Sequence, residues 1–178
     1  ELAVAELERT GAFDRAVVCV IPTTGTGWVN SAAPESLELM YGGDTAVVAT
    51  QYSYLPSWLS FLFDRGRAEE EGAALIDAVT ARVEQLPEGD RPRVLVYGES
   101  LGTASGEAAF AGLADIRART DGVLWTGPPN ANPIWSKLVE RRDPGTREVA
   151  PVYSDGLVVR FGDQPADLHD PDAPWLEP

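Results

Sequence analysis

The chain has 178 residues, 44% of them hydrophobic and 24% charged, and its formal net charge is −14. We predict a single globular domain over residues 1–178, since this length and composition can supply a sizeable core. The negative charge argues against nucleic acid or an anionic membrane surface as a partner, because both are bound through basic patches. No stretch approaches the roughly 18 continuous apolar residues of a membrane span.

Strands and helices are predicted to alternate along the chain. The segments with strand patterns are 15–21, 45–53, 92–98 and 121–127. Three of them are continuous apolar runs, which are typical of strands buried on both faces. Helical patterns fall at 2–9, 34–41, 56–63, 64–86, 101–116 and 134–142, with Pro34 expected as a first helical residue. This alternation predicts an α/β fold, a mostly parallel sheet with helices on both faces.

Two shorter patterns carry local predictions. Asp155-Gly156 stands between apolar runs, which predicts a β-hairpin within 148–162. Cys19 is the only cysteine and lies in an apolar run. We expect a buried structural thiol, because nothing basic sits beside it to lower its pKa.

The segment Gly98-Glu99-Ser100-Leu101-Gly102 is a G-x-S-x-G match between a predicted strand and a predicted helix. A nucleophile elbow needs this order, because the strand delivers the serine to the edge of the sheet and glycines fit the sharp turn. Ser100 is therefore the candidate nucleophile, with Gly98 and Gly102 as the elbow glycines. The alternative is a glycine-rich turn that only happens to contain serine. Glu99 places a second carboxylate beside Ser100, although its side chain is expected to point away.

An acyl-transfer site also needs backbone N–H donors for the oxyanion. Leu101, the residue after the serine, would supply one donor, and the loop after an earlier strand would supply the other. Thr24, Gly25 and Thr26 in that loop are the candidates, and the sequence does not choose among them. A dinucleotide fingerprint beginning at Gly25 is disfavoured, because its third glycine position is Asn30.

Aromatic residues gather after the second predicted strand, at the edge where α/β sheets bind ligands. Tyr52, Tyr54 and Trp58 are candidates for an acyl pocket, and a core position under a loop is an equal alternative. Asn130 and Asn132 follow the fourth predicted strand and are candidates for polar residues in the pocket wall.

The general base is not evident in the chain. His169 is the only histidine, in an acidic, proline-rich tail where a solvated loop residue is the more typical interpretation. The aspartates around it do not make a convincing metal site. We expect neither a metal nor another cofactor.

Several long segments resemble one known family. They are ELERTGAFDRAVV, TGTGWVN, GGDTAVVATQYSYLPSWLSFLFDR, VYGESLG and GLADIRARTDGVLWTGPPNANPIW. They resemble the α/β-hydrolase catalytic domain that actinobacterial proteins carry behind several transmembrane helices. The resemblance implies an α/β-hydrolase fold, Ser100 as nucleophile, and a membrane-anchored parent in which this domain is itself soluble. The family pattern continues past residue 178 into an Asp-bearing loop and a late histidine. The resemblance therefore implies that the C-terminal part of the domain is missing, and the triad acid and base with it.

The leading functional hypothesis is a serine hydrolase that cleaves an ester, thioester or related acyl bond of a small molecule or lipid. The alternatives are a non-catalytic binding module with the same fold and an acyltransferase that uses the same serine. No nucleic acid partner is expected, and the membrane is expected only through segments outside this chain.

Overall fold

A computed structural model describes residues 1–23, 26–51 and 65–168 of the chain. The chain divides into two compact units, Glu1–Pro129 and Asn130–Pro178. The first unit holds the sheet, and the second begins with a short helix. The expectation of a single domain stays a prediction. In the part of the chain that the structure describes, no helix is both long and apolar enough to cross a membrane.

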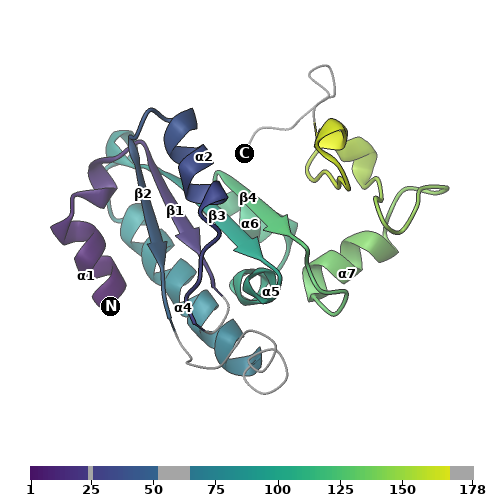
Figure 1. The fold of residues 1–178 in the computed structure, drawn as a ribbon, viewed down its shortest axis with the longest axis horizontal. Coiled ribbons are helices and arrows are strands. Elements are labelled where there is room, and N and C mark those ends of the chain that lie inside the picture. The colour runs from purple at the N-terminus through teal and green to yellow at the C-terminus, as the bar shows by residue number, and fades with distance from the viewer. Residues whose placement is uncertain (24–25, 52–64, 169–178) are drawn as a thin grey trace. The chain divides into compact units, whose positions relative to one another are not determined.

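The first unit is built on a four-stranded sheet in the order β2-β1-β3-β4, and every pair of neighbours is parallel (Figure 1). The strands are β1 (Val17–Ile21), β2 (Thr45–Ala49), β3 (Arg93–Glu99) and β4 (Gly122–Thr126). All four predicted strands are thus confirmed, and each ends within about four residues of its predicted bounds. The parallel sheet confirms the predicted α/β fold class.

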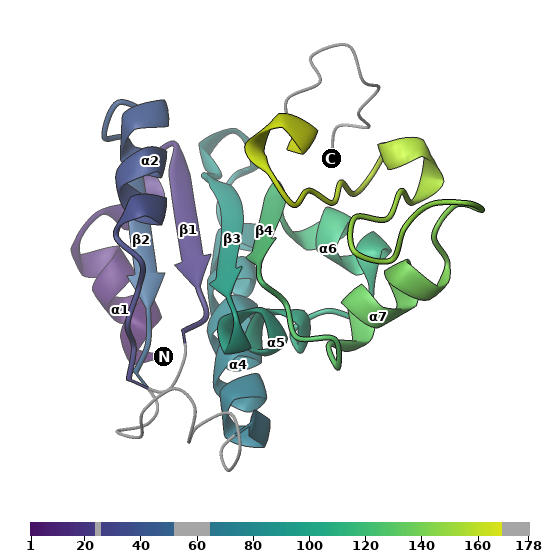
Figure 2. The same ribbon diagram turned by 45° about the vertical axis from the view of Figure 1, so that its right-hand side comes forward.

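Helices cover both faces of this sheet. The helices of the first unit are α1 (Leu2–Arg9), α2 (Ala32–Met40), α4 (Arg65–Glu84), α5 (Leu101–Glu107) and α6 (Leu113–Arg119). The views from two directions place α2 on one face and α4 and α5 on the opposite face (Figures 1 and 2). The second unit contains α7 (Pro133–Glu140). Short 3₁₀ turns lie at Ala12–Asp14, Glu88–Asp90, Ser154–Gly156 and Pro165–Leu168.

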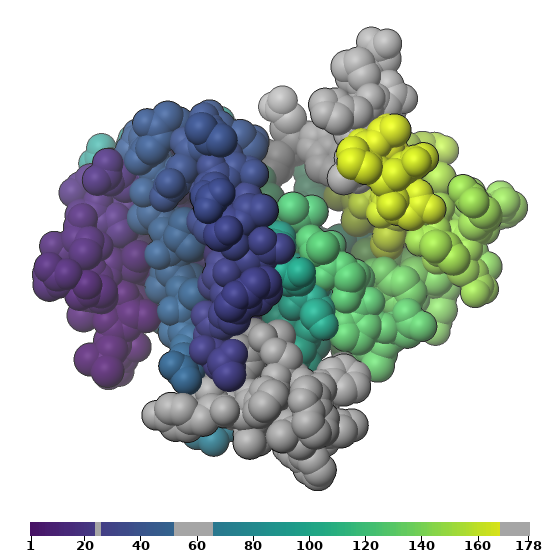
Figure 3. Space-filling model, in the orientation of Figure 1, coloured from purple at the N-terminus to yellow at the C-terminus, as the bar shows by residue number. Residues whose placement is uncertain are grey.

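The burial of the strands differs from the expectation that three are buried on both faces. Only β1, which lies between β2 and β3, is buried along its whole length. The edge strand β2 is half-buried or exposed throughout. In β3, Val94 and Val96 are buried, whereas Leu95, Tyr97 and Glu99 on the other face are half-buried. The surface of β3 and β4 is accordingly visible beside α2 in the space-filling view (Figure 3).

Apart from α1, the predicted helices that the structure describes begin or end at other residues than predicted, and the predicted helix at 56–63 lies outside the described residues. Helix α2 starts at Ala32, so Pro34 is its third residue and not its first; a proline is tolerated in the first turn because its missing N–H has no partner there. The predicted helix 101–116 is two helices, α5 and α6, separated at 108–112. The Asp115 carboxylate accepts a hydrogen bond from the Ala111 backbone N–H at 2.9 Å. Such a local bond offers the backbone an alternative to a continuous helix.

The predicted hairpin within 148–162 is wrong: these residues, all described, contain no strand. Asp155 and Gly156 do turn the chain, with φ of 54° and 73°. The Asp143 carboxylate accepts the backbone N–H groups of Ser154 at 3.0 Å and Asp155 at 2.9 Å. The turn is therefore held by hydrogen bonds to the Asp143 side chain and not by backbone hydrogen bonds between two strands. An isolated pair of strands is also only marginally stable.

Candidate active site

Ser100 connects β3 to α5 in a strained backbone conformation. Its φ is 52° and its ψ is −120°, a region that costs a non-glycine residue roughly 1–3 kcal/mol. Its N–H donates to the Thr126 carbonyl at 2.9 Å. Its own carbonyl accepts from the Thr103 N–H at 3.0 Å and from the Thr103 hydroxyl at 2.6 Å. Bonds to β4 and to α5 thus hold the strained residue, while its side chain is exposed.

The glycines on either side of Ser100 are required by close contacts. A Cβ at Gly98 would lie 2.8 Å from ring atoms of Trp125 and 2.9 Å from the Gly102 carbonyl oxygen. A Cβ at Gly102 would overlap the carbonyl oxygen of Pro22. Real side chains essentially never make such contacts, so the sharp turn can form only with glycine at both positions.

Helix α5 is packed on all sides, and all seven of its residues are buried. A Cβ at Gly106 would overlap the Trp125 ring, and a Cβ at Gly72 of α4 would lie 2.7 Å from the Ser105 Cβ. The Leu101 side chain packs with Ala68 and Ala104 in the core. Its backbone N–H belongs to the first turn of α5, where the helix supplies no acceptor.

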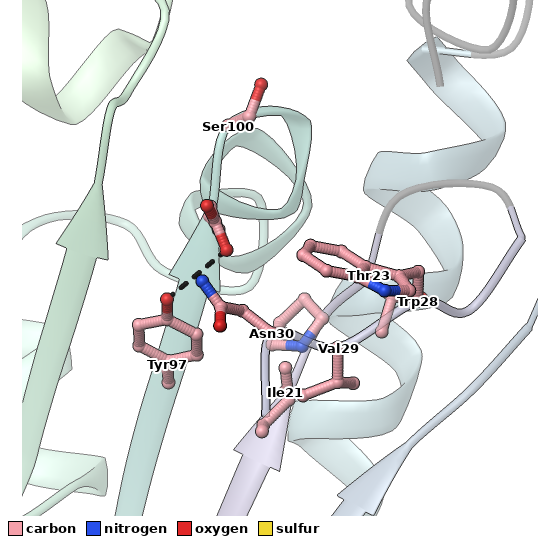
Figure 4. A pocket seen from close by; sticks show the side chains of 9 residues that line it. Ile21, Thr23, Trp28, Val29, Asn30, Tyr97 and Ser100 are labelled. Carbon is pink, nitrogen blue, oxygen red and sulfur yellow. Dashed lines mark hydrogen bonds between the residues drawn. The ribbon is translucent and has the colours of Figure 1, made fainter. Parts of the chain in front are cut away.

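The order of the strands brings Ser100 to the usual ligand position of such a sheet. From β1 the chain moves outward to β2, and from β3 it moves outward in the opposite direction to β4. The carboxyl ends of β1 and β3 are therefore the topological switch point, where α/β sheets bind ligands. A pocket of about 150 Å³ lies there. Its described lining residues are Ile21, Pro22, Thr23, Trp28, Val29, Asn30, Tyr97, Glu99 and Ser100 (Figure 4).

Tyr97 and Glu99 form a polar pair beside Ser100. The Tyr97 hydroxyl donates to the Glu99 carboxylate at 3.4 Å. Burial raises the pKa of Tyr97, and the negative charge of Glu99 raises it further against the opposing effect of a hydrogen bond with the Thr126 side chain. The Ser100 side chain points away from Tyr97 and from the carboxylate at the other end of its hydrogen bond, which is drawn as a dashed line (Figure 4). This geometry agrees with the expectation that the Glu99 side chain does not face the serine hydroxyl.

The loop after β1 borders the same pocket. The Thr23 hydroxyl donates to the Thr50 carbonyl at 2.6 Å, which ties this loop to the residue after β2. Of the three oxyanion candidates, Thr26 is exposed and is not among the described pocket-lining residues. Thr24 and Gly25 lie outside the described residues. The role of all three stays a prediction.

The remaining candidates from the sequence are not among the described residues that line this pocket. Tyr52, Tyr54, Trp58 and His169 lie outside them. Asn130 is exposed, and Asn132 is fully buried at the start of α7; both belong to the second unit. Among the described residues, no group of three or more His, Cys, Asp or Glu could hold a metal ion.

Trp28, Asn30 and Tyr97 are among the lining residues of the pocket that sequence reasoning missed. A usable signal was present for Tyr97, because it lies two residues before Glu99 and so shares its face of the strand. For Trp28 and Asn30 the signal was their place in the loop that follows the strand next to β3. That neighbour relationship is known only once the strand order is known.

A parallel sheet flanked by helices, with a strained serine at the sharp turn after a central strand, is the arrangement of α/β hydrolases. The comparison with protein families agrees with this class. The model of the Alpha/beta-hydrolase family matches residues 1–178, and the chain belongs to this family. Searches of curated proteins and of solved structures found no significant match. The α/β-hydrolase family and fold predicted from the sequence are thus confirmed, whereas the actinobacterial origin, the membrane-anchored parent and the missing C-terminal part stay predictions.

Proposed function

We propose that this chain provides the nucleophile of a serine hydrolase that cleaves an ester, thioester or related acyl bond, with Ser100 as the nucleophile. The observation that carries the proposal is the backbone of Ser100, held at a φ of 52° with an exposed side chain. Strained non-glycine residues cluster at functional sites, since strain persists only where the surroundings enforce it. The two crowded glycines and the bonds to Thr126 and Thr103 are that enforcement.

In the proposed reaction, the Ser100 Oγ attacks the acyl carbon and its proton passes to a general base. The carbonyl oxygen becomes an oxyanion, which the Leu101 N–H and a backbone N–H from the loop after β1 stabilise. The intermediate expels the alcohol or thiol, which takes up the proton, and an acyl-enzyme remains. Water then attacks the acyl-enzyme by the same steps and releases the acid, restoring the serine.

The proposal assigns the base to a histidine supported by a carboxylate, both outside the described residues. Tyr97 and Glu99 do not suit this role, because the Ser100 side chain points away from Tyr97 and from the carboxylate that the Tyr97 hydroxyl bonds (Figure 4). A base must come within hydrogen-bond reach of the proton that it removes. We expect the acid and base to come from the part of the domain that follows the sheet described above.

Labelling with a fluorophosphonate probe tests the proposal, because the probe reacts with activated serines. The full-length protein should be labelled stoichiometrically, and Ser100→Ala should abolish labelling and lower ester hydrolysis by at least roughly 10³-fold. Ser31→Ala, which removes another exposed serine hydroxyl, is the matched control and should be labelled like wild type.

Circular dichroism should first show that each variant is folded. A folded full-length protein that ignores the probe and all activated acyl esters would overturn the proposal and favour the non-catalytic binding module. Labelling at Ser100 combined with transfer of the acyl group to added alcohols, in preference to water, would favour the acyltransferase.

A further inference from the structure

The pocket beside Ser100 carries one charge and two aromatic rings. Among its described lining residues, Glu99 is the only charged one, and Lys and Arg are absent. Trp28 and Tyr97 are its aromatic residues. A carboxylate next to aromatic rings attracts a positively charged group, since the carboxylate supplies Coulomb attraction and each ring presents its negative face.

The Glu99 carboxylate is available to a ligand. It is half-buried, and none of the salt bridges between described residues involves it. Its hydrogen bond from Tyr97, at 3.4 Å, is long for an O–H···O bond and therefore weak. The carboxylate keeps most of its capacity to interact with a cation that enters the pocket.

The other side of the pocket supports the same ligand. The Trp28 side chain is 64% exposed, which is unusual for so large an apolar ring. It lies across from Tyr97, and the Asn30 side chain extends from the same loop toward the hydrogen bond that joins Tyr97 to Glu99 (Figure 4). Trp28 can therefore cover one side of a bound cation while Glu99 neutralises its charge.

We propose that this pocket binds an ammonium group, and that the acyl substrates of the site are esters of amino alcohols or similar cationic esters. The part about substrates rests on the proposed function, because it takes Ser100 as the nucleophile. Glu99 and Ser100 both line this pocket, so a ligand whose ammonium group meets Glu99 can present its acyl group to Ser100 from the same pocket. The net charge of −14 adds a long-range attraction for cationic substrates and a repulsion of anionic ones.

Equilibrium binding tests the pocket without any need for catalysis. The probes are choline and its neutral analogue 3,3-dimethylbutan-1-ol, titrated into the full-length protein by ligand-observed NMR at constant ionic strength. Choline should bind at least about tenfold more tightly than the neutral analogue. Glu99→Gln should remove that difference, and Trp28→Leu should weaken choline binding about two- to fivefold.

The matched control is Glu38→Gln, which removes one exposed carboxylate from α2. It should bind choline as wild type does, so that an effect of total charge is separated from an effect of Glu99. Equal binding of choline and its neutral analogue, or equal loss of binding in Glu38→Gln and Glu99→Gln, would overturn the inference.

Kinetics with a choline ester and the 3,3-dimethylbutyl ester of the same acid test the substrate class. The kcat/KM ratio should favour the choline ester by about tenfold and should fall to near one in Glu99→Gln. If Ser100 reacts with the fluorophosphonate but shows no preference for the cation, this inference fails and the proposed function stands. If choline binds through Glu99 but Ser100 is inert, the proposed function fails and the ammonium site stands.

Discussion

Gly102, in the first turn of α5, lies directly against the carbonyl oxygen of Pro22, the residue that follows β1. The contact is so close that no side chain can be placed between them. It joins the two segments that border the pocket, because Pro22 leads into the loop after β1 and Gly102 follows Ser100 by two residues. The distance between the serine and that loop therefore depends on a glycine at 102.

A methyl group at this contact should be costly. Gly102→Ala is expected to lower the free energy of unfolding by roughly 1–3 kcal/mol, since backbone must move to admit the new atom. It should also slow fluorophosphonate labelling, because Ser100 moves with α5. Gly89→Ala is the control, as no described heavy atom lies within 4 Å of its Cβ position, and it should change stability by less than about 1 kcal/mol. Urea unfolding of both variants compares them, and equal stabilities would contradict the contact.

The backbone strain at Ser100 should be measurable as a difference in the free energy of unfolding between two variants of this residue. Glycine adopts a φ of 52° without the steric cost that alanine bears, so Ser100→Gly should be more stable than Ser100→Ala by roughly 1–3 kcal/mol. Ser136 lies inside α7, where the order should reverse and the glycine variant should be about 1 kcal/mol less stable than the alanine variant. Thermal unfolding of the four variants measures both differences. The same order at the two positions would show that Ser100 is unstrained.

Cys19 should make the protein sensitive to alkali. Burial raises the pKa of its thiol from 9.0 to about 12. Since the folded state then holds the proton more tightly than the unfolded state, the stabilisation is complete below pH 9 and is lost as the pH rises toward 12. Between pH 7 and pH 10 wild type should lose roughly 1–2 kcal/mol more than Cys19→Ala. Urea unfolding at the two pH values measures the loss, and parallel pH dependences would contradict it.

Replacement of Arg119 by lysine should lower the free energy of unfolding. Its guanidinium donates to the Ala109 carbonyl at 2.7 Å and to the Thr80 hydroxyl at 3.1 Å, and it lies 5.2 Å from the centre of the Phe110 ring. A lysine ammonium cannot reproduce this planar, forked set of contacts. Arg119→Lys should therefore cost roughly 1–2 kcal/mol, whereas Arg141→Lys at an exposed position should be near neutral. Chemical unfolding measures the free energy of unfolding of both variants. Equal losses in Arg119→Lys and Arg141→Lys would show that Arg119 contributes only through its charge.

The predictions from the sequence succeeded where the pattern is local and repeated. Each run of apolar, mostly β-branched residues became a strand, and α1 has the bounds that its periodicity predicts. They failed where a side chain competes for the backbone. Asp115 helps to divide the predicted 101–116 helix, and Asp143 holds the chain at Asp155 without a hairpin. Periodicity reveals neither kind of bond, because the Asp115 bond spans only four residues and the Asp143 bonds span 11 and 12 residues of irregular chain.

By itself, the sequence determined the positions of the four strands along the chain and the glycine–serine–glycine turn at Ser100, because these depend on residues that are close along the chain. The tertiary structure alone decided what surrounds the serine. Trp28 and Asn30 come from the loop after β1, whereas Tyr97 and Glu99 lie in β3. They share a pocket because parallel pairing sets β1 beside β3 and brings their carboxyl ends to one edge, a relationship that arises only when distant segments pack together.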